Sequence, residues 1–125
     1  MARVEHANIT VSEPAKTARY LGDIFGWKTR WEGEAINGGY TIHVGENDSY
    51  VAIYRGPGEQ DAAPTSYSTL GGFNHLGVVV DDLDAVEARV KAAGFEPHSH
   101  ANYEPGRRFY FHDHDGIEIE VVCYT

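Results

Sequence analysis

The chain has 125 residues, one cysteine and a formal net charge of −9. This length allows one domain, residues 1–125, with a buried core, and the single cysteine excludes an intrachain disulfide and fits a cytoplasmic protein. The acidic charge repels phosphate backbones and no apolar run could span a bilayer, so we expect neither nucleic acid nor a membrane as partner.

The first half of the chain predicts a strand, a helix and three further strands. Residues 2–11 alternate between apolar and polar side chains, as in a half-buried strand, and His6 lies on the polar side. Ser12 is expected to cap the following helix, and Gly26 to end it. Three strands are predicted at residues 27–34, 40–44 and 49–55. The first unit therefore covers residues 1–55.

The second half repeats this order after a linker at residues 56–72, which is rich in Gly, Pro, Ser, Thr and Ala. His75 lies on the strand face that points away from the next helix. Asp82 is the expected cap of that helix and Gly94 its end. Strands are predicted at residues 95–103, 107–112 and 117–124. The second unit therefore covers residues 73–125.

The repeat predicts an α+β fold of two tandem βαβββ units, whose mixed sheets curve around a central cleft. His6 and His75 then occupy equivalent positions on the faces that the helices leave open, and Glu120 shares its strand face with Glu118. Two imidazoles and one carboxylate can hold a divalent transition metal (Fe, Mn, Zn or Ni) and leave coordination positions open. Alternatively, the histidines are ordinary half-buried residues and Glu120 is solvated.

Three segments carry a resemblance to a known family. They are Val4-Glu5-His6 with its helix, Asn74-His75-Leu76-Gly77-Val78, and the run from Tyr110 to Glu120 with its Asp113-His114-Asp115-Gly116 turn. The chain resembles, over almost its whole length, the vicinal oxygen chelate superfamily of glyoxalase I, extradiol dioxygenases, and fosfomycin and bleomycin resistance proteins. His114 stands where that ending usually has proline.

The resemblance implies that His6, His75 and Glu120 are the metal ligands. A fourth ligand position of the family falls on the segment 50–54, which has no carboxylate, imidazole or amide. Glyoxalase I requires that ligand, whereas extradiol dioxygenases and fosfomycin-modifying enzymes use two histidines and one glutamate. Tyr50 or Tyr54 could still contact the metal or the substrate, although packing is the alternative role for both.

The resemblance to extradiol enzymes also implies an acid–base histidine and a tyrosine ahead of the glutamate ligand. Tyr110 has the expected spacing from Glu120, and His100, with His98 as the alternative, lies on the preceding predicted strand. Tyr110 and His100 are therefore the predicted catalytic residues. The alternative for His98, His100, His112 and His114 is that they are exposed or turn histidines. Arg107 and Arg108 could neutralise an anionic substrate or could be solvated.

These features predict a metal-dependent enzyme that binds a small substrate through two neighbouring oxygens. The reaction is left open between extradiol-type dioxygenation, lyase or isomerase chemistry, and addition to a small molecule. The alternative is a metal-free binding protein of the bleomycin-resistance type, whose acidic charge would suit a basic ligand. The resemblance further implies a homodimer, with the site inside one chain or shared between two.

Overall fold

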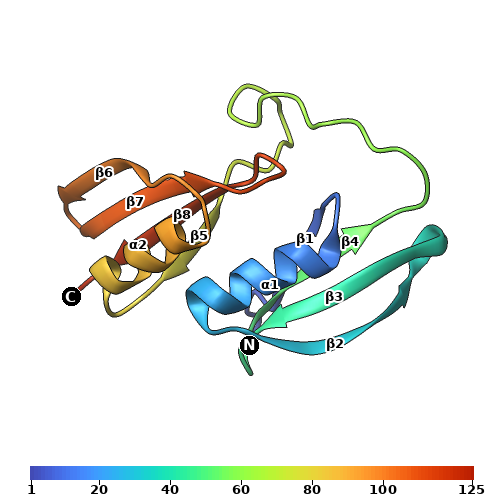
Figure 1. The fold of residues 1–125 in the computed structure, drawn as a ribbon, viewed down its shortest axis with the longest axis horizontal. Coiled ribbons are helices and arrows are strands. Elements are labelled where there is room, and N and C mark those ends of the chain that lie inside the picture. Colours follow the sequence, from blue (N-terminus) through green and yellow to red (C-terminus); the bar gives the residue numbers. More distant parts are fainter. The chain divides into compact units, whose positions relative to one another are not determined.

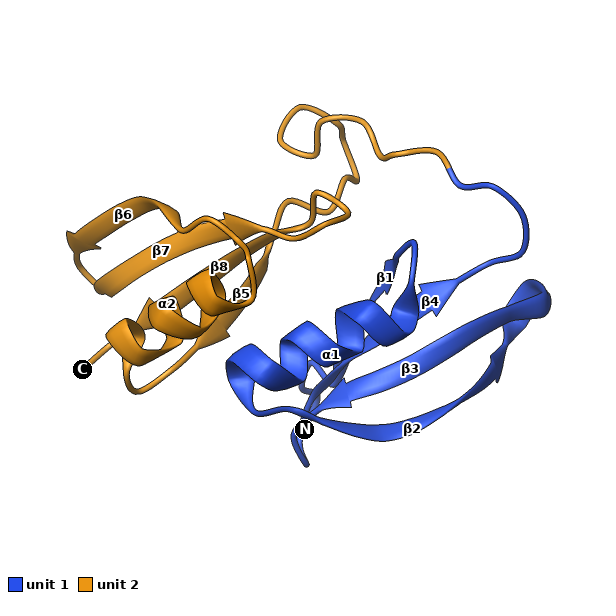
Figure 2. Cartoon of the chain, viewed as in Figure 1, with its two compact units in different colours: residues 1–60 blue, residues 61–125 orange.

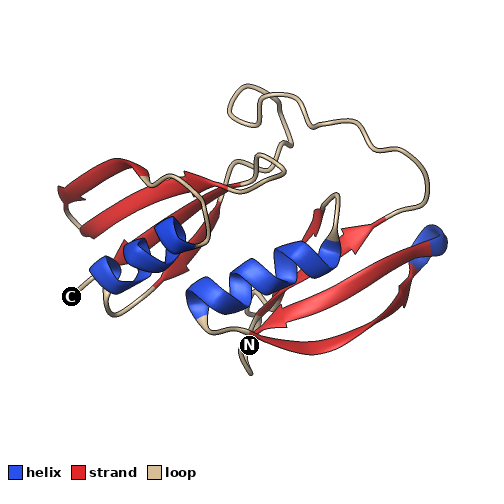
Figure 3. Ribbon diagram, viewed as in Figure 1, coloured by secondary structure: helices blue, strands red, loops and turns tan.

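The computed structural model describes residues 1–125, which form two compact units, Met1–Gln60 and Asp61–Thr125 (Figure 2). In each unit one helix packs on one face of a four-stranded mixed sheet (Figures 1 and 3). The predicted α+β class and the two βαβββ units are confirmed.

Unit 1 contains β1 (His6–Thr10), α1 (Pro14–Phe25), β2 (Lys28–Ala35), a 3-10 turn (Ile36–Gly38), β3 (Gly39–Gly45) and β4 (Tyr50–Arg55). Its strands lie in the order β1-β4-β3-β2, with β1 parallel to β4 and the other pairs antiparallel. The single parallel pair joins the first and last strands of the unit, which α1, β2 and β3 separate in the chain. A parallel pair cannot be joined by a tight turn, because its strands need a longer crossover connection.

Unit 2 contains β5 (Leu76–Val79), α2 (Leu83–Ala92), β6 (His98–Tyr103), β7 (Gly106–His112) and β8 (Glu118–Cys123). Its strand order is β5-β8-β7-β6, again with one parallel pair, β5 and β8. The two sheets therefore have the same topology, and positions in one unit can be matched to positions in the other by their register.

The helix ends follow from local sequence, with one difference from the prediction. The N-cap of α1 is Glu13, one residue after the predicted cap Ser12, and it makes no side-chain cap bond. Pro14 takes the first helical position, where its missing N–H costs no helical hydrogen bond. Gly26 ends α1 in the left-handed conformation, with φ of 73°. In α2 the predicted cap is confirmed: the Asp82 carboxylate accepts a hydrogen bond from the backbone N–H of Ala85.

The core of unit 2 decides which side chains reach its open sheet face. Phe109 and Phe111 of β7 are fully buried, as are Ile119 and Val121 of β8, and α2 contacts both strands. Because side chains alternate along a strand, the intervening residues point to the face that α2 does not cover. These residues are Arg108, Tyr110, His112, Glu118 and Glu120.

Unit 1 sorts its side chains in the same way. Ile42, Val44 and Ile53 are buried on the face that α1 contacts, and His43 and Tyr50 alternate with them on the other face.

No helix in either unit is long and apolar enough to cross a membrane.

Candidate metal centre

The two predicted histidine ligands share a local arrangement. Nδ1 of His75 lies 2.6 Å from Oδ1 of Asn74, and Nδ1 of His6 lies 2.9 Å from Oε1 of Glu5. In both cases the residue just before the histidine supplies an acceptor, which favours the tautomer with the proton on Nδ1. Nε2 of each ring then keeps its lone pair, which is the state that a metal ligand requires.

Unit 2 brings His75 and Glu120 together. Nε2 of His75 lies 3.3 Å from Oε1 of Glu120, and the two side chains are 30% and 12% exposed. This proximity arises because His75 lies just before β5, two residues ahead of Gly77, which pairs in register with Glu120 of β8. Two lone-pair atoms at this distance repel unless a cation or a proton lies between them. The pair thus suits a shared metal ion, or an imidazolium–carboxylate ion pair.

The other oxygen of Glu120 is held by two donors from β7. The Tyr110 hydroxyl and the Arg108 guanidinium each donate a hydrogen bond of 2.9 Å to Oε2. Burial, together with this hydrogen bond, raises the pKa of Tyr110, so the phenol stays protonated as a donor at neutral pH. Glu120 is therefore oriented with Oε2 fixed by the sheet and Oε1 directed to His75.

A second group of side chains surrounds Glu118, beside Glu120 on the same face. The Tyr67 hydroxyl donates a hydrogen bond of 2.5 Å to Oε1 of Glu118, and Nε2 of His112 lies 3.5 Å from Oε2. His98 continues this chain, with Nε2 lying 3.0 Å from Nδ1 of His112. Both carboxylate oxygens of Glu118 therefore have a partner within unit 2.

The predicted catalytic pair lies on two different faces of the sheet. Tyr110 bonds Glu120 on the open face, whereas Nε2 of His100 lies 2.8 Å from Oε2 of Glu87 in α2. A bulge in β6 accounts for this: Ser99 has φ of 56°, and the register with β7 shifts between His98 and Ala101. His98 is left opposite Tyr110, with the two rings stacked at 6.4 Å.

In unit 1, His6 belongs to an aromatic cluster on the open face. Its ring stacks on Tyr50 at 4.8 Å, and Tyr50 stacks on His43 at 4.5 Å. Trp31 packs against His43, and the Arg30 guanidinium lies 4.7 Å from the centre of the Tyr50 ring. Burial, followed by the nearby His6, lowers the pKa of His43, so this imidazole is neutral at pH 7. Tyr54 instead donates to the backbone oxygen of Ile36, at 3.0 Å.

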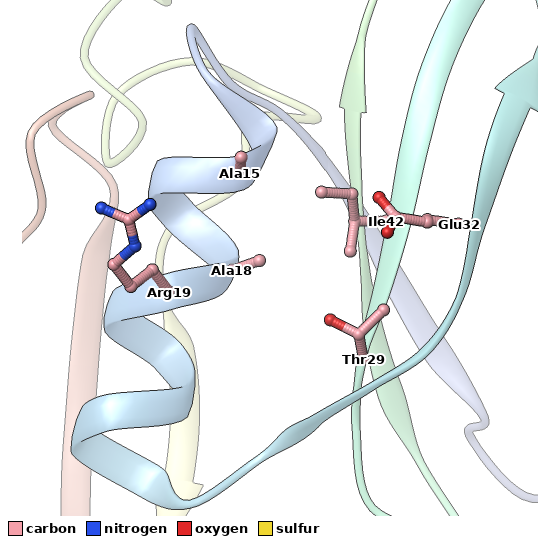
Figure 4. Close-up of a pocket in the computed structure, with 6 residues that line it drawn as sticks. All are labelled: Ala15, Ala18, Arg19, Thr29, Glu32 and Ile42. Atoms are coloured by element: carbon pink, nitrogen blue, oxygen red, sulfur yellow. The ribbon is translucent and has the colours of Figure 1, made fainter.

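A shallow pocket of about 270 Å³ in unit 1 lies on the other side of the sheet, between α1 and strands β2 and β3. It is lined by Ala15, Ala18, Arg19, Thr29, Glu32 and Ile42 (Figure 4). Ile42 and His43 are adjacent on β3 and point to opposite faces, so the pocket is separated by the sheet from the cluster around His6.

The predicted ligands are divided between the units, with His75 and Glu120 in unit 2 and His6 in unit 1. No three His, Cys, Asp or Glu side chains gather closely enough in the structure to hold a metal. The donor chemistry nevertheless fits a divalent transition metal, because His75 offers Nε2 and Glu120 offers Oε1 at adjoining positions. Asn74 and Tyr67 are two contacts of this region that were not predicted from the sequence. The acceptor side chains before both histidines were the available signal for Asn74.

The duplicated βαβββ topology agrees with a match to one protein family. Residues 3–121 match the Glyoxalase/Bleomycin resistance protein/Dioxygenase superfamily, and the chain belongs to it. No curated protein sequence matches the chain.

Solved structures with the same fold include a glyoxylase/bleomycin resistance protein/dioxygenase domain from Frankia sp. EAN1pec, with 22% identity, a TM-score of 0.81 and coverage of 100% of this chain and 99% of that one. FosX, a fosfomycin resistance protein from Listeria monocytogenes complexed with Mn(II) and sulfate, has 20% identity and a TM-score of 0.74, covering 100% and 94%. FosX from Mesorhizobium loti has 21% identity and a TM-score of 0.71, covering 98% and 91%. At these identities the likeness shows the fold.

Proposed function

We propose that the protein is a metal-dependent enzyme in which His6, His75 and Glu120 hold a divalent metal. The observation that carries this proposal is the orientation of the ligand side chains. Both histidines have Nδ1 engaged by the preceding residue, and Glu120 directs Oε1 toward Nε2 of His75. Such second-sphere contacts fix ring orientation and tautomer in metal sites. We also propose that the protein is a cytoplasmic homodimer. The metal site lies either within one chain or between the two chains of the dimer.

The metal, when bound, would act as a Lewis acid for a small substrate that presents two neighbouring oxygens. Tyr110 is protonated and donates its single O–H to Oε2 of Glu120 at 2.9 Å, so its role in this state is to orient that carboxylate. The reaction is extradiol-type dioxygenation, lyase or isomerase chemistry, or addition to a small molecule. An acid–base role for His100 stays a prediction, and its contact with Glu87 places it on the helix side of the sheet.

Manganese is a reasonable first metal to test, since FosX from Listeria monocytogenes was solved as a complex with Mn(II). The experiment is metal analysis of protein purified without added metal, followed by titration with Mn²⁺, Fe²⁺, Zn²⁺ and Ni²⁺. We expect one bound divalent ion per chain in the wild type and loss of binding in His75→Ala and Glu120→Gln. His114→Ala, outside the proposed ligand set, is the control. Full stoichiometric binding by His75→Ala would contradict the proposal.

Oxygen uptake then separates the reaction classes. Fe²⁺-dependent uptake with a panel of catechols selects dioxygenation, whereas a bound metal without uptake favours lyase, isomerase or addition chemistry. Size-exclusion chromatography with light scattering tests the dimer.

A metal-free small-molecule binding protein of the bleomycin-resistance type is the second candidate. It is favoured by one observation, that the His75–Glu120 contact at 3.3 Å also suits an ion pair without metal. A chelator separates the two candidates, because a metal that binds only the folded state must stabilise it. An unchanged melting temperature on chelation, with no metal bound, would favour the binding protein.

A further inference from the structure

Arg108 differs from every other Lys or Arg of unit 2. The unit, Asp61–Thr125, contains four such residues: Arg89, Lys91, Arg107 and Arg108. Arg89 and Lys91 belong to α2, and the Arg107 guanidinium lies 3.0 Å from Asp84 of α2 with its side chain 49% exposed. Arg108 points to the opposite face, beside Glu120, and is only 13% exposed. The open face of this sheet therefore carries one permanent cation.

The donor capacity of Arg108 is only partly used. A guanidinium has five N–H groups. Here one terminal nitrogen donates to Oε2 of Glu120 at 2.9 Å and the other donates to the backbone oxygen of Gly106 at 3.3 Å, while Nε is buried without a partner. The Tyr103 ring stacks against the group at 4.9 Å. Glu120 is thus the only anion that compensates Arg108 within unit 2.

A metal changes this balance. A divalent ion bound through Oε1 of Glu120 would share the negative charge of this carboxylate with Arg108, which Glu120 now neutralises. Neutral imidazole ligands add no negative charge. The neighbouring carboxylate, Glu118, contacts Tyr67 and His112 and adds one negative charge, so Glu118 and Glu120 together do not balance a divalent ion and Arg108. Positive charge at this face would then exceed negative charge, and a poorly solvated guanidinium without a full counter-charge is unfavourable.

We propose that Arg108 is a substrate-binding residue for an oxyanion, namely a carboxylate, phosphonate or phosphate group on the small substrate. Glu120 compensates the guanidinium when no metal is bound, and the substrate oxyanion takes over part of that role in the metal-loaded protein. Metal and oxyanion therefore bind with positive coupling that runs through Arg108. This inference rests on the proposed function, because Glu120 must be a metal ligand, and it adds the charge class of the substrate.

The test measures methylphosphonate binding by calorimetry, with and without saturating Mn²⁺, in the wild type and in Arg108→Gln. We expect the wild type to bind methylphosphonate at least about tenfold more tightly with Mn²⁺ than without, and Arg108→Gln to lose roughly ten- to a hundredfold in the metal-loaded state. Arg107→Gln, one residue away on the other face, is the matched control and should bind as the wild type does. Acetate should follow methylphosphonate, whereas ethylene glycol should bind equally to all variants.

Two further measurements keep the outcome clear. Arg108→Lys retains the buried charge but not the forked donor geometry, so it should keep the wild-type melting temperature and bind methylphosphonate with intermediate affinity. Electron paramagnetic resonance measures the Mn²⁺ affinity. Adding methylphosphonate should raise the Mn²⁺ affinity of the wild type by the same factor and should not change the Mn²⁺ affinity of Arg108→Gln.

Methylphosphonate affinity that is equal in wild type and Arg108→Gln would overturn the inference, as would an equal loss in Arg107→Gln. Mn²⁺ binding to the wild type without any effect of Arg108 on the anion would overturn this inference and leave the proposed function standing. Failure of the wild type to bind any divalent metal would overturn both.

Discussion

Ala52 of β4 occupies in unit 1 the register position that Glu120 of β8 occupies in unit 2. Asn8, two residues after His6, pairs with Ala52, just as Gly77, two residues after His75, pairs with Glu120. The antiparallel neighbours correspond as well. His43 lies opposite Ala52, where Tyr110 lies opposite Glu120. The duplicated sheet therefore has a methyl group where its second copy has the proposed carboxylate ligand.

Ala52→Glu should supply the carboxylate that unit 1 lacks. Ala52 is 2% exposed, so an added carboxylate without a partner should lower the free energy of unfolding by about 1–3 kcal/mol in the absence of metal. If the new carboxylate reaches the metal, Mn²⁺ should raise the melting temperature of the variant more than that of the wild type, as followed by differential scanning calorimetry. Ala52→Gln, with similar size but a weaker donor, is the control. An equal rise in variant and wild type would show that position 52 does not reach the metal.

Asn74→Leu should weaken metal binding without removing a proposed ligand. The Asn74 side chain accepts a hydrogen bond from Nδ1 of His75 at 2.6 Å. Without this acceptor, neither the orientation of the His75 ring nor the position of its proton is fixed. Second-sphere changes of this kind cost roughly ten- to a hundredfold in metal affinity, which a Mn²⁺ titration measures. Asn102→Leu, on exposed β6, is the control and should leave the affinity unchanged. An unaltered affinity in Asn74→Leu would mean that His75 needs no such support.

Asp82→Ala should destabilise the protein, whereas Glu13→Ala should not. Asp82 accepts a hydrogen bond of 3.1 Å from Ala85 at the start of α2, but Glu13 at the start of α1 has no side-chain cap bond. Loss of an N-cap costs about 1 kcal/mol, and a substitution without such a bond typically stays within about 0.5 kcal/mol. Urea denaturation measures both values. Equal effects of the two substitutions would contradict the difference in capping.

Tyr67 should titrate well above an ordinary tyrosine. Its hydrogen bond to Glu118 raises the pKa of Tyr67 to about 12, because the carboxylate stabilises the neutral phenol and repels the phenolate. Since the pKa is raised in the folded state, the stabilising contribution is complete below pH ~10 and is lost as the pH rises toward 12. Absorbance at the phenolate band should show this late titration in the wild type. Tyr67→Phe should remove it, and Glu118→Gln should return it to the ordinary range.

Strand and helix order could be predicted from the sequence because local patterns encode them. Alternation around His6 and His75, the capping residue Asp82 and the terminating Gly26 each act within a few residues, and the structure confirms the two βαβββ units that they imply. The open-face location of His75 and Glu120 follows from the same alternation, because the helix must cover the apolar side of the sheet. Their close contact requires in addition the register of β5 against β8.

The faces of the two histidines on β6 could not be predicted from local alternation. Strict alternation would place His98 and His100 on one face, but the bulge at Ser99 leaves His98 with Tyr110 and sends His100 to Glu87. Arg107 and Arg108 are equivalent as neighbours in the sequence, yet one lies beside Asp84 of α2 and the other beside Glu120. In both pairs the partner comes from an element distant in the sequence.

Sequence patterns alone were sufficient to predict the two βαβββ units and to propose the metal ligands, because periodicity and donor chemistry are local properties. Tertiary structure alone decided which oxygen of Glu120 is directed to His75 and which is held by Arg108 and Tyr110. It also showed that Ala52 is the counterpart of Glu120, since that correspondence depends on strand register. Register and bulges are set by packing between strands that are far apart in the chain, so no local pattern specifies them.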